Sequence, residues 1–311
     1  MKTLLLTGTF AALAVIAAPV AAQEQHPAQV THADHGHHHA DFESGRFHVR
    51  VDGPVGAPDV ILIPGLTSSP EVWQKLTDVL STRYRVHRIH IQGFAGAAPE
   101  DNAEGPVSAP VAEDLARYIV AQGLTRPAVI GHSMGGTIAM MLSARHPAAV
   151  GRVMVVDMLP FLGNAFAGAA ATSESVAAMA DMIGSGIASS TPEAWAANSA
   201  QSVTGMIKTE AERAGPIEDG RTSDPRVAGH AMRELIVTDL RSELPSITAP
   251  LTVLYVAFEA PGMTPEMTDG IYQASFANRP GTVLKRIDDS AHFIMLDQPA
   301  RFAAEVNAFL E

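Results

Sequence analysis

The chain has 311 residues, of which 47% are hydrophobic and 17% charged, so it can bury a large core and does not have the composition of a disordered protein. Its formal net charge of −12 makes nucleic acids and anionic membrane surfaces unfavourable partners, because like charges repel. The chain contains no cysteine, which excludes disulfides, zinc thiolate sites and cysteine nucleophiles.

Residues 1–22 have the pattern of a secretory signal peptide. Lys2 gives a positive start, residues 4–18 are apolar, and residues 20–22 are small enough for a cleavage site. The alternative is a retained membrane anchor, but the apolar run is short for a span of roughly 20 residues and Pro19 ends it. We therefore expect an exported protein, periplasmic or secreted, with no stable membrane insertion after cleavage.

Residues 23–44 form a polar, histidine-rich leader that we exclude from the fold. It carries six of the 13 histidines, including His35, His37, His38 and His39. Neutral imidazoles bind zinc, copper and nickel, so this run is a candidate for a nonessential metal site. Because the run lacks a fixed ligand spacing, a disordered linker remains the alternative.

From Phe47 onward, short strand patterns alternate with helical patterns. The expected strands are residues 47–51, 60–63, 84–91, 127–130 and 152–156, and the expected helices are residues 70–80, 107–122 and 137–145. Strand and helix units of this length predict an α/β fold, with a mostly parallel central sheet and helices on both of its faces.

Residues 159–241 interrupt this alternation, because they are rich in Ala, Ser and Met and their propensity is mostly helical. The alternation resumes with expected strands at 251–256 and 282–287 and expected helices at 265–277 and 299–310. A helical block between late strands of one sheet predicts a cap inserted into a single domain of residues 45–311. Two separate domains are the alternative, but the returning strands would then lack a partner sheet.

The sharpest local signal is Gly131-His132-Ser133-Met134-Gly135, which follows the strand at 127–130 and opens a helix. A G-x-S-x-G sequence between a strand and a helix predicts a tight turn that exposes a serine hydroxyl above the sheet. Glycine is needed on either side of Ser133 because a side chain there would collide with neighbouring backbone. The N-terminus of the following helix favours negative charge developing nearby.

A serine hydroxyl is a weak nucleophile until a base takes its proton, and His292, just after the last expected strand, is the candidate base. With this histidine loop, the serine turn and the order of elements, the chain from about Phe47 onward resembles the α/β-hydrolase family. The resemblance implies that Ser133 is the nucleophile and His292 the general base. It also excludes dehalogenases and epoxide hydrolases of the family, which require aspartate at the position of Ser133.

Two residues are candidates for the acid that orients His292. The family most often places it after the strand at 251–256, where this sequence has Ala257 and where Glu259 is one residue out of register. Some relatives take the acid from the end of the preceding strand, which here is Asp157. We favour Asp157, because Glu259 would have to correct its register.

The resemblance also implies an oxyanion hole, formed by the backbone amides of Met134 and Leu66. Pro64 stands where many relatives have histidine, so the loop that carries Leu66 must be held in another way. In the predicted cap, Met179, Met182, Trp195 and Met206 either line an acyl pocket or form ordinary core.

These observations together predict an exported serine hydrolase that cleaves a small, apolar carboxylic ester through an acyl-enzyme. The expected chemistry needs neither a metal in the active site nor an organic cofactor. The same triad would serve an amidase or peptidase, a lactonase or a carbon–carbon hydrolase. A non-catalytic binding protein of this fold is the alternative from a different functional class.

Overall fold

The structure is a computed structural model that describes residues 42–311. The predicted signal peptide at 1–22 and the candidate metal ligands His35, His37, His38 and His39 lie outside the described residues. Among the residues described, no helix is long and apolar enough to cross a membrane.

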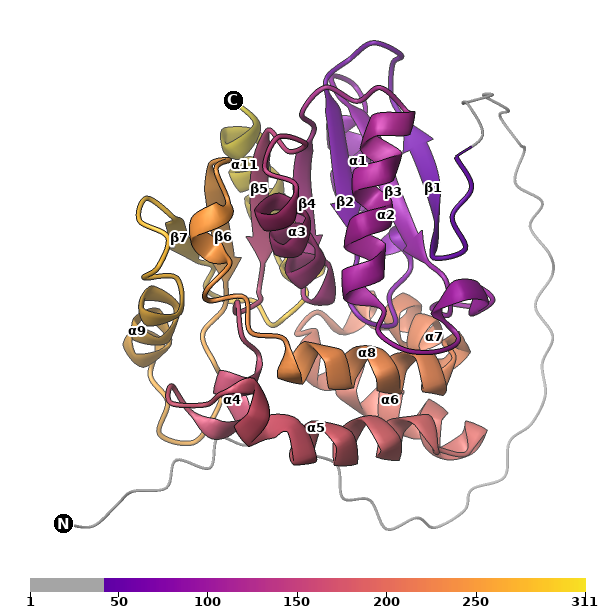
Figure 1. The fold of residues 1–311 in the computed structure, drawn as a ribbon, viewed down its shortest axis with the longest axis vertical. Helices are drawn as coiled ribbons and strands as arrows, with labels where there is room; N and C mark the ends of the chain where they lie inside the picture. Colours follow the sequence, from indigo (N-terminus) through magenta and orange to yellow (C-terminus); the bar gives the residue numbers. More distant parts are fainter. Residues whose placement is uncertain (1–41) are drawn as a thin grey trace.

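Seven strands form one sheet with the order β1-β3-β2-β4-β5-β6-β7 (Figure 1). Strand β1 pairs antiparallel with β3, and every other neighbouring pair is parallel. The mostly parallel sheet confirms the predicted fold class. The strands are β1 (Phe47–Asp52), β2 (Asp59–Ile63), β3 (Arg85–Ile91), β4 (Ala128–His132), β5 (Arg152–Val156), β6 (Leu251–Tyr255) and β7 (Val283–Arg286).

Helices cover both faces of the sheet, because its central strands are hydrophobic on both sides. In β2, Ile61 and Ile63 belong to one core cluster, while Val60 and Leu62 belong to a second cluster on the opposite face. The first cluster includes residues of α2 and α3, and the second includes residues of α1 and α11. These helices are α1 (Gln74–Leu80), α2 (Ser108–Ala121), α3 (Met134–Arg145) and α11 (Pro299–Leu310); α9 (Pro265–Ser275) and α10 (Ile294–Asp297) lie in the last third of the chain.

Two helices begin differently from the sequence expectation. The helix expected at 70–80 starts as a 3₁₀ turn, Pro70–Trp73, before α1. Helix α3 starts at Met134, not at residue 137, although Gly135 and Gly136 have low helix propensity. Tertiary packing overrides propensity here, since both glycines are buried against neighbouring strands.

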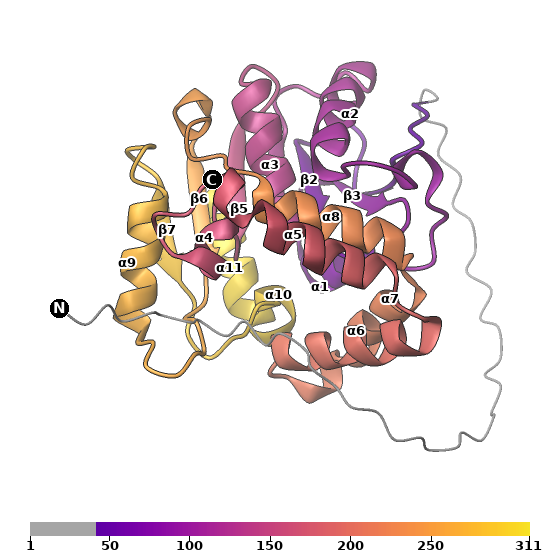
Figure 2. The same ribbon diagram turned by 60° about the horizontal axis from the view of Figure 1, so that its bottom comes forward.

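A helical insert lies between β5 and β6 and extends across the carboxyl edge of the sheet (Figures 1 and 2). Its long helices α5 and α8 pack closely because two glycines meet: a Cβ added at Gly229 would lie 2.4 Å from the Gly184 carbonyl oxygen. The helices of the insert are α4 (Gly163–Ala167), α5 (Ser173–Ala188), α6 (Pro192–Met206), α7 (Ala214–Thr222) and α8 (Pro225–Val237), which fall within the range predicted for the cap.

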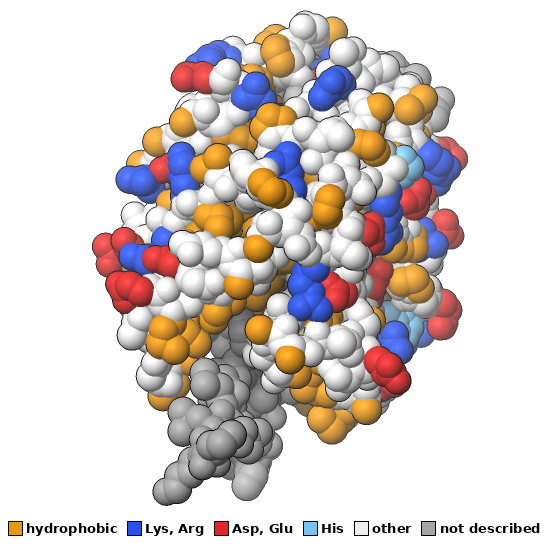
Figure 3. All heavy atoms as spheres, turned by 60° about the vertical axis from the view of Figure 1, so that its left-hand side comes forward, with side chains coloured by type: hydrophobic (Ala, Val, Ile, Leu, Met, Phe, Trp, Pro, Cys, Tyr) orange, Lys and Arg blue, Asp and Glu red, His pale blue; other side chains and the backbone are white. Residues whose placement is uncertain are grey.

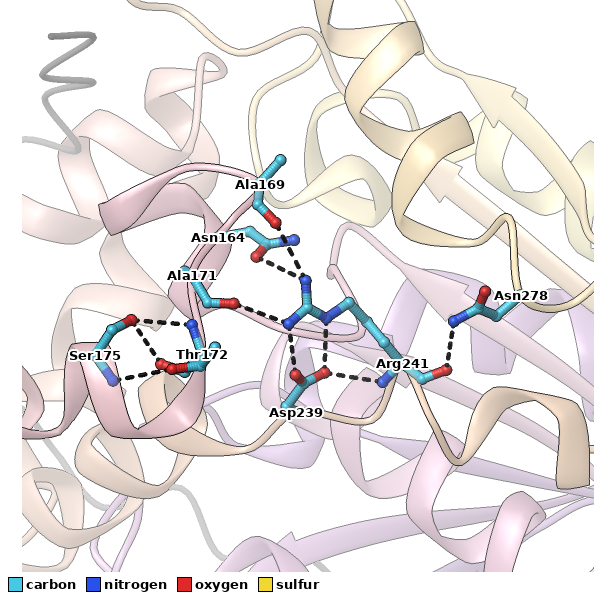
Figure 4. A network of polar contacts seen from close by, with 8 residues as sticks. All are labelled: Asn164, Ala169, Ala171, Thr172, Ser175, Asp239, Arg241 and Asn278. Atoms are coloured by element: carbon cyan, nitrogen blue, oxygen red, sulfur yellow. Dashed lines mark hydrogen bonds and ion pairs between the residues drawn. The ribbon is translucent and has the colours of Figure 1, made fainter.

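Arg241 joins the two ends of this insert (Figure 4). Its guanidinium binds both carboxylate oxygens of Asp239, at 2.8 and 2.6 Å, and donates to the Ala171 carbonyl oxygen at 2.9 Å. It also lies over the ring of Phe161, which forms an isolated antiparallel bridge with Asp239. The entry and exit of the insert are therefore fastened to each other on one side of the sheet edge.

We predict that Arg241→Gln lowers the free energy of unfolding by about 2 kcal/mol, because hydrogen bonds to a charged group at a partly buried site are lost. Arg233→Gln is the matched control: its ion pair with Asp181 is exposed on both sides and should contribute at most about 1 kcal/mol. Chemical denaturation measures both values. Equal losses in the two variants would contradict the role given to Arg241.

Candidate active site

The four loops that carry the predicted site residues meet at one edge of the sheet. Leu66 follows β2, Ser133 follows β4, Asp157 follows β5 and His292 lies beyond β7. Since these strands are parallel, their carboxyl ends lie on the same side, which is where open α/β sheets bind their ligands. The helical insert begins at this edge, directly after β5.

Ser133 stands in a strained turn between β4 and α3. Its backbone has φ 52° and ψ −120°, a positive φ that is rare for a residue with a side chain. A Cβ added at Gly131 would lie 2.0 Å from the Gly135 carbonyl oxygen, and one added at Gly135 would lie 2.2 Å from that of Ile63. Both glycines are therefore required by close backbone contacts, as the sequence predicted.

The loop that carries Leu66 lies directly against this turn. A Cβ added at Gly65 would lie 3.1 Å from the Cβ of Ser133. Among residues 42–311, no acceptor takes a hydrogen bond from the backbone amide of Leu66 or of Met134. The two amides proposed for the oxyanion hole are thus free to bind an anion beside Ser133.

Asp157 and His292 are in direct contact. The Nδ1 atom of His292 lies 2.6 Å from Oδ2 of Asp157, and the Asp157 side chain is only 7% exposed. The second carboxylate oxygen accepts hydrogen bonds from the Val256 amide and the Tyr272 hydroxyl, both at 3.1 Å. The carboxylate is therefore held on both oxygens and fixes the orientation of the imidazole.

Glu259, the other candidate acid, lies elsewhere. Its side chain is 72% exposed and forms an ion pair with Lys208 at 2.9 Å. The structure brings Asp157 to His292 and leaves Glu259 at the surface. The one-residue offset noted in the sequence is thus not corrected by the backbone after β6.

Tyr272 is a site residue that the sequence did not indicate. It lies in α9, is fully buried, and stacks on Tyr255 with 4.0 Å between the ring centroids. Burial, followed by the nearby charge of Asp157, raises the pKa of Tyr272 well above its usual value, so the hydroxyl stays protonated and donates. A tyrosine in a helical pattern indicates ordinary core packing. Nothing in its spacing indicates a contact with Asp157, which lies 115 residues earlier in the chain.

His132, next to the serine, contacts the base from behind. Its Nε2 lies 3.0 Å from the backbone carbonyl oxygen of His292, and the centroids of the two rings are 4.6 Å apart. Because a carbonyl oxygen only accepts, Nε2 carries the proton and donates. Burial, followed by the charge of His292, lowers the pKa of His132 well below its usual value, which keeps the ring neutral.

No hydrogen bond joins Ser133 to the His292 imidazole within the described part of the chain. The ring of His132, the neighbour of Ser133 in the chain, packs on that of His292. Catalytic hydrogen bonds are often long in unliganded enzymes and shorten when substrate binds.

The methionines of the insert do not act as one group. Met182 is 68% exposed, Met206 lies at the surface, and Met179 packs on a small cluster around Phe161. Trp195 is buried, and its indole N–H donates to the Ser223 carbonyl oxygen at 3.0 Å. Ordinary packing accounts for Met179, and the surface position of Met182 does not fit an acyl pocket.

A cavity of about 650 Å³ lies at the opposite, amino-terminal edge of the sheet, near Arg126 and Arg152. Their guanidinium groups donate to the carbonyl oxygens of Val150 and Phe309. These contacts hold the segment before β5 and the end of α11, and Ser133 is not among the residues that line the cavity. Across residues 42–311, no group of three or more His, Cys, Asp or Glu side chains is placed to hold a metal ion.

Comparison with known proteins gives the family. Residues 60–305 match the sequence profile of the alpha/beta hydrolase family. One curated relative, epoxide hydrolase 3 of Xenopus tropicalis, is 30% identical over 126 residues, which are 40% of this chain. The match covers 34% of that protein, so the chain spans about a third of the length of this relative.

Solved structures share the fold over most of the chain. The enol-lactonase from Burkholderia xenovorans LB400 has a TM-score of 0.68 at 20% identity, covering 85% of this chain and 96% of the other. The thermophilic esterase from Thermogutta terrifontis has a TM-score of 0.68 at 17% identity, covering 85% and 92%. At these identities the likeness shows the shared fold.

We predict that His132 makes the folded state sensitive to mild acid. Its pKa is lower in the folded than in the unfolded chain, so its contribution to stability is present above pH 6.5 and is lost as the pH falls below that value. The free energy of unfolding should fall by up to about 1.4 kcal/mol per pH unit more in the wild type than in His132→Asn. Urea unfolding between pH 7.5 and 5 measures this, and equal slopes would contradict it.

Proposed function

The chain belongs to the alpha/beta hydrolase family, and on that premise we propose that it is a serine hydrolase that cleaves carboxylic esters through an acyl-enzyme. The observation that carries the proposal is the 2.6 Å contact between His292 and the buried Asp157. It lies beside a strained turn that holds Ser133 at a positive φ. Nucleophile, base and orienting acid are the three parts that acyl transfer needs.

In the first half of the reaction, Nε2 of His292 takes the Ser133 proton while the serine Oγ attacks the ester carbonyl carbon. Asp157 stabilises the imidazolium that forms, because its carboxylate accepts the Nδ1–H hydrogen bond. The carbonyl oxygen becomes an oxyanion, for which the amides of Leu66 and Met134 are the proposed donors. His292 then gives its proton to the departing alcohol, leaving the acyl group on Ser133.

In the second half, a water molecule enters and His292 takes one of its protons. The resulting hydroxide attacks the acyl carbon, the bond to the serine Oγ breaks, and His292 returns the proton to Ser133. The acid is released and the enzyme is restored. Each step uses only groups of this chain, the ester and water.

Among the similar structures are an esterase and an enol-lactonase, and these two support an ester as the substrate class. The similarity to epoxide hydrolase 3 does not favour epoxide opening here, because serine stands where that chemistry requires aspartate. Amidase, lactonase and carbon–carbon hydrolase activities use the same triad and are separated from esterase activity by a substrate panel.

The charges of the chain do not favour a polyanionic substrate. On the face shown in Figure 3, Lys and Arg side chains are interspersed with Asp and Glu side chains and form no continuous basic surface. With a net charge of −12, the chain lacks the electrostatic attraction that nucleic acids need. Hydrophobic side chains are scattered among the charged ones on the same face.

We predict that a fluorophosphonate probe labels the protein and that Ser133→Ala abolishes the labelling. Asp157→Asn should lower kcat for an acyl ester by roughly 10⁴-fold, as loss of the orienting acid does in other serine hydrolases. Glu259→Gln is the matched control, and its kcat should stay within about twofold, because its exposed ion pair contributes little.

Two results would contradict the assignment. A folded wild type that neither reacts with the probe nor hydrolyses any ester, amide or lactone would favour a non-catalytic binding protein. A larger loss of kcat in Glu259→Gln than in Asp157→Asn would move the acid to the loop after β6.

We also predict that Tyr272→Phe lowers kcat by about tenfold or more, because a hydrogen bond to a charged carboxylate contributes about 1.5–3 kcal/mol. Tyr255→Phe is the control within the same stacked pair: its hydroxyl donates to Asp269, away from Asp157. Steady-state kinetics of the two variants measure the effect. Equal losses would mean that only the packing of the stack matters.

A further inference from the structure

The helical insert contacts both loops that complete the candidate active site. We call residues 288–293, which carry His292, the base loop, and residues 64–69, which carry Leu66, the oxyanion loop. Each loop is joined to the insert by a carboxylate that accepts hydrogen bonds from backbone amides. This carboxylate belongs to Asp297 at the base loop and to Asp219 at the oxyanion loop.

Asp297, the last residue of α10, bridges the base loop and the insert. One of its oxygens accepts from the Ala291 amide at 2.9 Å and from the Lys208 amide at 3.1 Å, and the other accepts from the Thr209 amide at 2.8 Å. Burial alone would raise the pKa of this carboxyl, but the three amides lower it below its usual value. The carboxylate therefore binds the residue next to His292 and the turn after α6 at once.

A second contact lies beside the first. The Phe293 amide donates to the Met206 carbonyl oxygen at 3.3 Å. Both neighbours of His292 in the chain, Ala291 and Phe293, are therefore held where the base loop meets the turn after α6. Arg213 in turn donates to the carbonyl oxygens of Ile207 and Lys208, which keeps the turn after α6 in place. The position of the base thus depends on the insert.

Asp219, in α7 of the insert, holds the oxyanion loop. Its carboxylate accepts from the Ser69 amide at 2.9 Å. One turn later, the Ser223 hydroxyl donates to the Asp219 carbonyl oxygen at 2.7 Å and accepts from the Ala95 amide at 2.8 Å. The contact of Asp219 with the Ser69 amide supports the oxyanion loop, in which proline stands at position 64.

The oxyanion loop also stores backbone strain. Thr67 has φ 58°, an unfavourable conformation for a β-branched residue. Strained residues of this kind persist only where the surroundings over-determine them. The Thr67 carbonyl oxygen lies 3.4 Å from the Ser223 hydroxyl, and the Ser69 amide two residues later is bound by Asp219.

We propose that Asp297 and Asp219 are positioning residues, through which the insert holds the base loop and the oxyanion loop in their catalytic geometry. The insert would then be a fixed part of the active site and not a lid that opens over a finished one. This inference rests on the proposed serine hydrolase function. It assigns the two carboxylates no contact with substrate, because their partners are backbone amides.

Glu234 provides a matched control. This buried carboxylate in α8 also joins the insert to the rest of the domain, and it accepts from three consecutive amides, those of Val107, Ser108 and Ala109, at 2.6–2.9 Å. These amides belong to the start of α2, so Glu234 contacts neither catalytic loop. Its loss should weaken the contact between α8 and the start of α2, while the contacts of Asp297 and Asp219 with the two loops stay in place.

The test compares Asp297→Asn, Asp219→Asn and Glu234→Gln with the wild type in ester hydrolysis and probe labelling. We expect kcat and the labelling rate to fall roughly 10- to 100-fold in the two Asp variants, with KM changed less than about threefold, because small misplacements of reacting groups have effects of this size. Glu234→Gln should lower the melting temperature and keep kcat.

Hydrogen exchange gives a readout that needs no activity. In Asp297→Asn, exchange should rise together in peptides covering the base loop and residues 206–210, and in Asp219→Asn it should rise in the oxyanion loop. Unchanged exchange and unchanged kcat in both variants would overturn the proposal, as would an equal loss of kcat in Glu234→Gln. A wild type without hydrolase activity but with these exchange changes would overturn the proposed function and support the coupling of the insert to the loops.

Discussion

The Asp157 carboxylate is almost fully buried at the end of β5, and a buried charge is stable only when hydrogen bonds compensate it. Three donors do so: the His292 imidazole, the Tyr272 hydroxyl and the Val256 amide. These donors lie 99, 115 and 135 residues after Asp157 in the chain, so satisfying one charge draws the end of β5, the last strands and α9 together at the carboxyl edge. The orientation of the His292 imidazole is a consequence of that requirement.

The helical insert continues this arrangement outward. The insert begins directly after Asp157, and Arg241 joins its two ends. The chain then enters β6, and the residue after that strand, Val256, donates to Asp157. Two carboxylates at the contact between the insert and the rest of the domain, those of Asp219 and Asp297, bind backbone amides of the loops around Ser133. Amide partners fix the path of the backbone and leave side chains free.

Much of this was predictable from local patterns. The alternation of strands and helices gave the parallel sheet and the insert, and the glycines around Ser133 gave the strained turn, because both depend on residues close in sequence. Tyr272 and the link through Asp297 were not predictable, since each joins segments that the chain brings together only in the folded state. The choice of Asp157 depended on its place at a strand end, whereas export and the metal-binding leader rest on sequence alone and stay predictions.

The central claim is that Ser133 carries the acyl group during turnover. Mixing the protein with an activated acyl ester, quenching within one turnover and mapping the peptides by mass spectrometry tests this most directly. The account predicts that the mass of the acyl group appears on the peptide containing Ser133 and disappears as acid is released. Ester turnover with that peptide unmodified throughout, or with the acyl group on another residue, would contradict it.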